Sequence, residues 1–266
     1  MPKKFKILAD NHAARKDLKL CWGFSCLIGP VRSKKRPEDI SVTEVSGTLA
    51  TSNGINEEVL FDTGEMNDVL AFNMDKMGVQ IEKIKKLVIS HDHYDHTGGL
   101  EAVLERNSKI DVYLLSDFSK ELKKRVSSFG AKIIENDKFI EISEGIYTTG
   151  KIEGEYAGSY IPEQAIAVKT KKGLIVITGC SHPLVTDIVQ TVKNQFPKDK
   201  IHLVFGGFHL LEKSEREVEY IAGSMKELGV EKVGPTHCTG EEAIQIFREE
   251  FKDRFVKIGV GTILEF

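Results

Sequence analysis

One segment, residues 90–99, limits what this chain can fold into more than any other, because it reads S-H-D-H-Y-D-H-T-G-G. It follows an apolar run, 87–90, that is typical of a short buried strand. In an extended stretch, residues two positions apart point to the same side, so His91 and His93 can hold one ion together. The segment therefore predicts a metal site at the end of a strand.

Asp95 and His96 lie one step further along, where the chain turns into a predicted helix, and they can face a second ion. Imidazole and carboxylate groups suit zinc, iron or manganese. Three histidines and two aspartates within six residues would be costly to bury without a ligand. The alternative is a polar surface turn, which requires this clustering to be accidental.

The composition is that of a globular chain without a strong charge bias. Of its 266 residues, 41% are hydrophobic, and the formal net charge is −3. The small charge argues against a nucleic-acid partner, which a strongly basic surface would attract. We find neither an apolar run as long as a membrane span nor the apolar stretch of a signal peptide. We therefore expect a cytoplasmic location and no membrane partner, and we leave the oligomeric state open.

Apolar periodicity predicts strands that alternate with helices. Strands are expected at 59–61, 87–90, 112–115, 131–135, 139–149, 165–170, 174–178, 201–205, 232–236, 255–258 and 262–266. Helices are expected at 67–77, 97–106, 118–129, 184–196, 218–228 and 243–251, with Thr97 as the N-cap of the second. This order favours an α/β sandwich in one domain, 1–266, with a long loop or insertion at about 30–58.

The motif H-D-H-Y-D-H resembles the His-x-His-x-Asp-His signature of the metallo-β-lactamase superfamily. L-F-D-T-G at 60–64 resembles the first motif of that superfamily, which implies that Asp62 braces the metal loop by hydrogen bonds without binding metal. The resemblance implies an α/β (α+β) fold, a four-layer αβ/βα sandwich with metals at one edge. Three strings, at 177–182, 205–210 and 235–240, narrow it to the branch known as dihydropterin–ribofuranosylaminobenzene 5'-phosphate synthases.

The resemblance also implies a ligand set drawn from both halves of the chain. The predicted metal ligands are His91, His93, Asp95, His96, His182 and His237. Relatives carry a bridging aspartate at the strand end where this chain has Cys180, so His182 is expected as the third ligand of the first metal. Cys180 is either a thiolate ligand or a buried packing residue.

Two further residues near these motifs are harder to assign. His209 follows two glycines at another strand end and contacts either substrate or metal, or is structural. Cys238, beside the predicted ligand His237, is assigned to packing.

Two divalent ions, zinc in preference to iron or manganese, would lower the pKa of a shared water and deliver hydroxide to an ester, phosphoester, thioester or amide. Asp95 would orient that water or move its proton. Predicted helix N-termini after Ser181 and Thr239 offer backbone N–H groups to a phosphate, so both residues are expected at the substrate, unless they only cap helices.

The predicted function is a metal-dependent hydrolase or phosphate-ester enzyme. Its expected substrate is a small, anionic, phosphorylated metabolite, with pterin-like compounds included. The alternatives are a di-iron redox enzyme, a nuclease or phosphodiesterase of the same superfamily, and a binding module without catalysis.

Overall fold

The computed structural model describes residues 2–31 and 57–266. The loop or insertion predicted at about 30–58 falls almost entirely on residues 32–56, which lie outside the described residues. Within the described residues, no helix is both long and apolar enough to cross a membrane.

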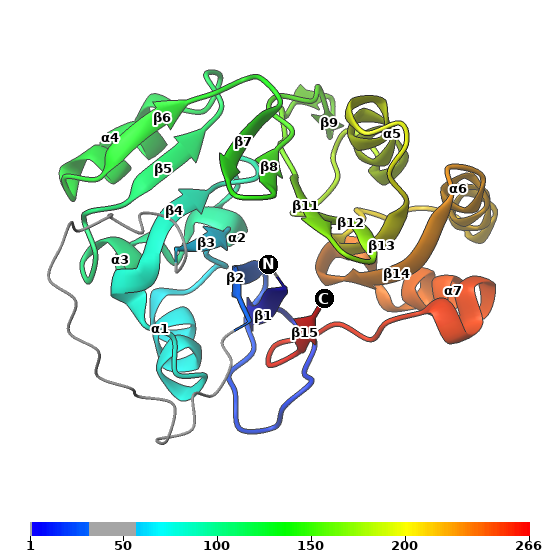
Figure 1. Ribbon diagram of the computed structural model, residues 1–266, viewed down its shortest axis with the longest axis horizontal. Coiled ribbons are helices and arrows are strands. Elements are labelled where there is room, and N and C mark those ends of the chain that lie inside the picture. The colour runs from blue at the N-terminus through cyan, green and yellow to red at the C-terminus, as the bar shows by residue number, and fades with distance from the viewer. Residues whose placement is uncertain (1, 32–56) are drawn as a thin grey trace, which may run out of the picture.

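Two mixed sheets form the centre of the structure (Figure 1). The first has the strand order β15-β1-β2-β3-β4-β5-β6, the second β14-β13-β12-β11-β8-β7, and β9 and β10 form a separate hairpin. The strands are β1 (Lys3–Ala9), β2 (Ser25–Pro30), β3 (Glu58–Phe61), β4 (Ile84–Val88), β5 (Asp111–Leu114), β6 (Lys132–Glu135), β7 (Ile140–Ser143), β8 (Ile146–Thr148), β9 (Glu155–Tyr156), β10 (Ser159–Tyr160), β11 (Ile166–Thr170), β12 (Gly173–Thr178), β13 (Ile201–Gly207), β14 (Val230–Thr236) and β15 (Ile263–Glu265).

Helices cover the outer face of each sheet, as Figure 1 shows on its left and right sides. The α-helices are α1 (Asn67–Lys76), α2 (Tyr94–Thr97), α3 (Leu100–Leu104), α4 (Lys120–Ser128), α5 (Val185–Gln195), α6 (Glu215–Glu227) and α7 (Glu241–Phe251). Short 3₁₀ turns are η2 (Ile81–Lys83), η3 (His237–Thr239) and η4 (Lys252–Arg254). One apolar cluster joins α1, α3 and α4 to the first sheet, and another joins α5, α6 and α7 to the second.

A third apolar cluster fills the space between the two sheets. β12 shows how one strand serves two layers, because successive side chains point to opposite faces. Leu174 and Val176 pack under the helices, whereas Ile175 and Ile177 pack between the sheets. The order helix, sheet, sheet, helix confirms the predicted four-layer αβ/βα sandwich.

The site is positioned by the parallel parts of the two sheets. β3 and β4 are parallel, as are β12, β13 and β14. The carboxyl ends of parallel strands lie at one edge of a sheet, which is where ligands bind in open α/β folds. The loops that follow β4, β12 and β14 carry the predicted metal ligands, and those that follow β3 and β13 carry Asp62 and His209.

Several predicted elements were wrong in detail. β1 and β2 were not predicted, although the alternation of Lys4, Phe5, Lys6 and Ile7 in β1 is typical of a half-buried strand. The helix expected at 97–106 is split into α2 and α3. Thr97 ends α2 rather than capping a helix, and its hydroxyl donates to the carbonyl of His93. The strand expected at 139–149 is the hairpin β7–β8, and 255–258 holds only a bridge from Phe255 to Val233.

Gly98 separates α2 from α3 and packs tightly against the chain. A Cβ at Gly98 would lie 1.9 Å from the carbonyl oxygen of Glu65, whereas a Cβ at Gly223, inside α6, would meet nothing within 4 Å. We expect Gly98→Ala to destabilise the protein by about 1–3 kcal/mol through overpacking. Gly223→Ala should instead add up to about 1 kcal/mol through helix propensity. Thermal unfolding of both variants checks this, and a stable Gly98→Ala protein would contradict it.

Candidate metal centre

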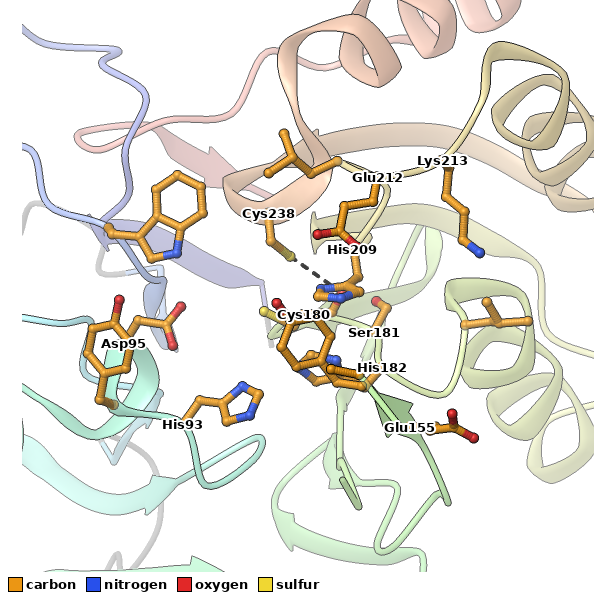
Figure 2. A pocket seen from close by; sticks show the side chains of 16 residues that line it. His93, Asp95, Glu155, Cys180, Ser181, His182, His209, Glu212, Lys213 and Cys238 are labelled. Carbon is orange, nitrogen blue, oxygen red and sulfur yellow. Dashed lines mark hydrogen bonds between the residues drawn. The ribbon is translucent and has the colours of Figure 1, made fainter. Parts of the chain in front are cut away.

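The candidate metal ligands leave the strands at one edge of the two sheets. His91, His93, Asp95 and His96 follow β4, Cys180 and His182 follow β12, His209 follows β13, and His237 opens η3 after β14. Their side chains converge on one region, and Figure 2 shows the members that line the pocket. Both halves of the chain therefore contribute donors to one cluster.

The first group of donors is built from histidine rings. The ring of His91 lies 4.7 Å, between centroids, from those of His93 and His182, which are 5.0 Å apart. Nε2 of His91 and both ring nitrogens of His182 are buried without a hydrogen-bond partner among the described residues. Burial and the neighbouring imidazoles of His209 and His93 lower the pKa of His182 to about 3. Neutral imidazole is the form that binds a metal.

The second group combines a carboxylate, two imidazoles and a thiol. Sγ of Cys180 lies 3.3 Å from Nε2 of His96 and 3.3 Å from Nε2 of His237. Oδ2 of Asp95 lies 3.5 Å and 3.4 Å from the same two nitrogens. Donor atoms around one tetrahedral ion, at about 2.0–2.3 Å from it, are about 3.3–3.8 Å apart. The four side chains are thus spaced as the ligands of one ion would be.

Asp62 supports the ligand loop after β4 through hydrogen bonds. Its carboxylate accepts from the backbone N–H of Ser90 at 2.6 Å and from the Ser90 hydroxyl at 2.7 Å. Its Oδ2 also lies 2.7 Å from Nδ1 of His96. Because a carboxylate can only accept, this contact places the ring proton on Nδ1 and leaves Nε2 of His96 free to bind a metal.

Several of the donors, namely His93, Asp95, Cys180, His182 and His209, line a cavity of about 510 Å³, a size that suits a small molecule. The ring of Trp22 packs 5.2 Å from that of His237. The ring of Tyr156 packs 5.5 Å from that of His182 and 5.0 Å from that of His209. Trp22 and Tyr156 are 38% and 41% exposed, so aromatic surface remains available at the cavity wall.

The family model of the metallo-beta-lactamase superfamily matches residues 46–237. The chain belongs to this superfamily. The curated relative 7,8-dihydropterin-6-methyl-4-(beta-D-ribofuranosyl)-aminobenzene-5'-phosphate synthase, from Methanocaldococcus jannaschii, is 31% identical over 81% of this chain and 86% of its own length. An uncharacterized protein of the same organism is 27% identical over 79% of this chain and 89% of its own length.

Solved structures of the same superfamily match almost the whole chain. Tm1679, a metal-dependent hydrolase of the beta-lactamase superfamily, is 30% identical, with a TM-score of 0.74 and 99% of both chains covered. The metallo-beta-lactamase fold protein YhfI from Bacillus subtilis has a TM-score of 0.63 at 15% identity, covering 98% of this chain and 99% of its own. At this identity, the similarity to YhfI supports the fold only.

Cys180 stands where the superfamily resemblance places a bridging aspartate. Its sulfur belongs to each compact set of donors found in the described part of the chain, including one with His91 and His182 and one with His209 and Cys238. Cys180 is buried, and its backbone N–H donates to the Glu163 carboxylate at 2.9 Å. A thiolate there could contact an ion in either group, as a bridging carboxylate would.

The hydroxyl groups of Ser181 and Thr239 both bond to backbone carbonyls. Ser181 lines the cavity, but its hydroxyl donates to the carbonyl of Gly207. Thr239 is fully buried, donates to the carbonyl of Thr236 and lines a separate groove beside α7. The backbone N–H groups of Cys180 and Ser181, which lead into the predicted helix N-terminus, donate to Glu163. These two amides are therefore not available to a phosphate, and the phosphate site at the start of α5 stays a prediction.

Several residues at the site were missed from the sequence. Cys238, assigned to packing, lines the cavity and forms a hydrogen bond with His209, drawn as a dashed line in Figure 2. Its position beside His237 was the available signal. Trp22, Tyr156 and Glu163 belong to no recognisable motif, and long-range packing alone brings them to the ligands.

Cys180 and Cys238 allow a matched test of the thiol donor, because both are buried free cysteines at the same cavity. We expect Cys180→Ala to weaken binding of one divalent ion and to abolish the sulfur-to-cobalt charge-transfer absorption of the Co²⁺-loaded protein. Cys238→Ala should keep that absorption. The measurement is a Co²⁺ titration followed by ultraviolet and visible absorption, and an unchanged Cys180→Ala spectrum would exclude a Cys180–metal bond.

Proposed function

We propose that this protein is a metal-dependent hydrolase that acts on a small molecule. The observation that carries the proposal is the spacing of Asp95, His96, Cys180 and His237, which suits one tetrahedral ion, beside a second cluster of buried, neutral imidazoles. One matching relative is a synthase by name, and another is a metal-dependent hydrolase of the beta-lactamase superfamily. A binuclear site, with zinc favoured, is part of the proposal.

Divalent ions held there would supply a water nucleophile at neutral pH and polarise the oxygen of a carbonyl or phosphoryl group. Asp95 lines the pocket, where its carboxylate would orient the attacking water and hold its proton. Burial disfavours its charged form, but the neighbouring imidazole groups of His237 and His96 hold the pKa of Asp95 below its ordinary value. Asp95 is therefore ionised at neutral pH.

The walls of the cavity favour a substrate with a flat ring. Trp22 comes from the loop after β1, whereas Tyr156 comes from the β9–β10 hairpin on the other half of the chain. Ala157 and Gly158, both at positive φ, form the tight turn that holds this hairpin over the site. A planar ring between two aromatic walls suits a pterin-like compound, in line with the name of the curated relative.

An anionic group on the substrate would meet Lys213 as well as the metal ions. Lys213 lines the pocket beside Glu212, and its ammonium group lies 3.4 Å from Glu217, an exposed ion pair that is easily exchanged. Glu155 also lines the pocket. We therefore place the anionic group of the substrate toward Lys213 and the reacting bond toward Asp95.

Metal removal tests the proposed function. We expect about two ions per chain, and a chelator that strips them should abolish hydrolysis of any phosphodiester, thioester or lactam that the protein accepts. His93→Ala and His237→Ala should each lower the metal content measured on purified protein. His202→Gln is the matched control, because His202 lies on β13 and pairs with Glu231 away from the site. Full activity in metal-free protein would refute the proposal.

The aromatic wall has its own test in the β9–β10 hairpin. Tyr156→Ala should raise KM for a substrate with a flat ring about fivefold, with kcat little changed, because a lost aromatic pair costs about 1 kcal/mol. Tyr160→Ala is the control, since Tyr160 lies on the same hairpin, is 52% exposed and bonds to Asp117 instead. Steady-state kinetics of both variants provide the measurement. Equal KM values for Tyr156→Ala and Tyr160→Ala would contradict binding of a ring against Tyr156.

A further inference from the structure

Glu163 is a buried carboxylate with an unusual set of partners. It is fully inaccessible to solvent and precedes β11. Its Oε1 accepts from the backbone N–H groups of Cys180 and Ser181, both at 2.9 Å, and its Oε2 accepts from that of His182 at 2.8 Å. Three consecutive amides of one candidate ligand loop therefore point at a single side chain.

That loop cannot hold its shape by local interactions alone. Ser181 and Leu184 have φ values of 72° and 85°, in the left-handed region that residues with a side chain rarely adopt. Such backbone persists only where its surroundings fix it. The three amide bonds to Glu163 supply that support directly beside the Cys180 and His182 side chains.

The next residue, Gln164, makes the corresponding contacts to the other ligand loop. Its backbone N–H donates to the carbonyl of Ser90 at 2.8 Å, and its side-chain amide donates to the carbonyl of Ile89 at 2.8 Å. Ser90 directly precedes His91. Two adjacent residues thus bond to the loop after β12 and to the loop after β4.

We propose that Glu163 and Gln164 are positioning residues that set the distance between the two halves of the metal centre. The proposal rests on the proposed function, because it assigns them to the same site. Glu163 fixes Cys180 and His182, whereas Gln164 fixes the start of the His91 loop. The backbone of Glu163 is itself held, by paired hydrogen bonds of 2.9 and 3.0 Å to Ile152, so the pair provides a rigid reference for both loops.

The test is Glu163→Gln, which keeps the size of the side chain but turns one acceptor oxygen into a donor that opposes an N–H group. We expect the Co²⁺ affinity of the variant to fall about 10- to 100-fold, as for other partners that support metal ligands. The visible d–d bands of the bound Co²⁺ should also shift. In metal-free protein, hydrogen exchange of the amides of residues 180–182 should become at least about tenfold faster.

Asn73→Asp is the matched control. Asn73 is also fully buried and bonds to three backbone groups, the carbonyls of Leu8 and Lys19 and the N–H of Lys19, each at 2.9 Å. This variant should lower the melting temperature without changing Co²⁺ affinity, the d–d bands or the exchange of residues 180–182.

A Glu163→Gln protein with wild-type Co²⁺ affinity, spectrum and exchange would overturn the positioning role. Wild-type protein that binds Co²⁺ but hydrolyses no phosphodiester, thioester or lactam would overturn the proposed function alone. The spectrum and the exchange rates do not depend on turnover, so the two failures are told apart.

Discussion

Buried carboxylates hold the candidate ligand loops, and the geometry of the site depends on them. Asp62 bonds to Ser90 and His96 in the loop after β4, and Glu163 bonds to three amides in the loop after β12. Asp10 accepts from the hydroxyl of Thr236, the residue before His237, at 2.7 Å. Each loop that carries candidate ligands from β4, β12 and β14 is thus bonded to an acidic side chain from another part of the chain.

This arrangement links the charge of the site to the stability of the fold. Burying a carboxylate is costly unless hydrogen bonds and opposite charges offset the loss of hydration. Burial raises the pKa of Glu163, against the effect of the three amide bonds that favour its charged form. Divalent ions bound nearby would favour the ionised carboxylates further. The carboxylates and the ions would therefore stabilise one another, so that metal binding contributes to folding as well as to chemistry.

The sequence predicted the parts of the site that are local. The donors in 90–99 are contiguous, and the superfamily resemblance and the four-layer sandwich followed from motifs at strand ends. What it could not predict depends on contacts between distant residues. Nothing in the local pattern shows that Glu163, 17 or more positions earlier, takes the N–H groups of Cys180 and Ser181, which lead into the predicted helix N-terminus. For the same reason Trp22, which reaches the pocket from the N-terminal region, carried no signal.

Cys180, at the end of β12, makes the hydrogen bonds from the buried carboxylates important for the proposed metal centre. A carboxylate has two oxygens with which to contact two ions, whereas Cys180 offers one sulfur, so in the proposed binuclear site the sulfur would have to lie between both donor groups. Its contacts of 3.3 Å with His96 and His237, and its place in the set with His91 and His182, fit that position. A single atom shared in this way tolerates little displacement of its loop. If Cys180 contacts both ions of the proposed site, cysteine in place of aspartate would make that site more dependent on Glu163, because Glu163 accepts from the amide of Cys180 itself.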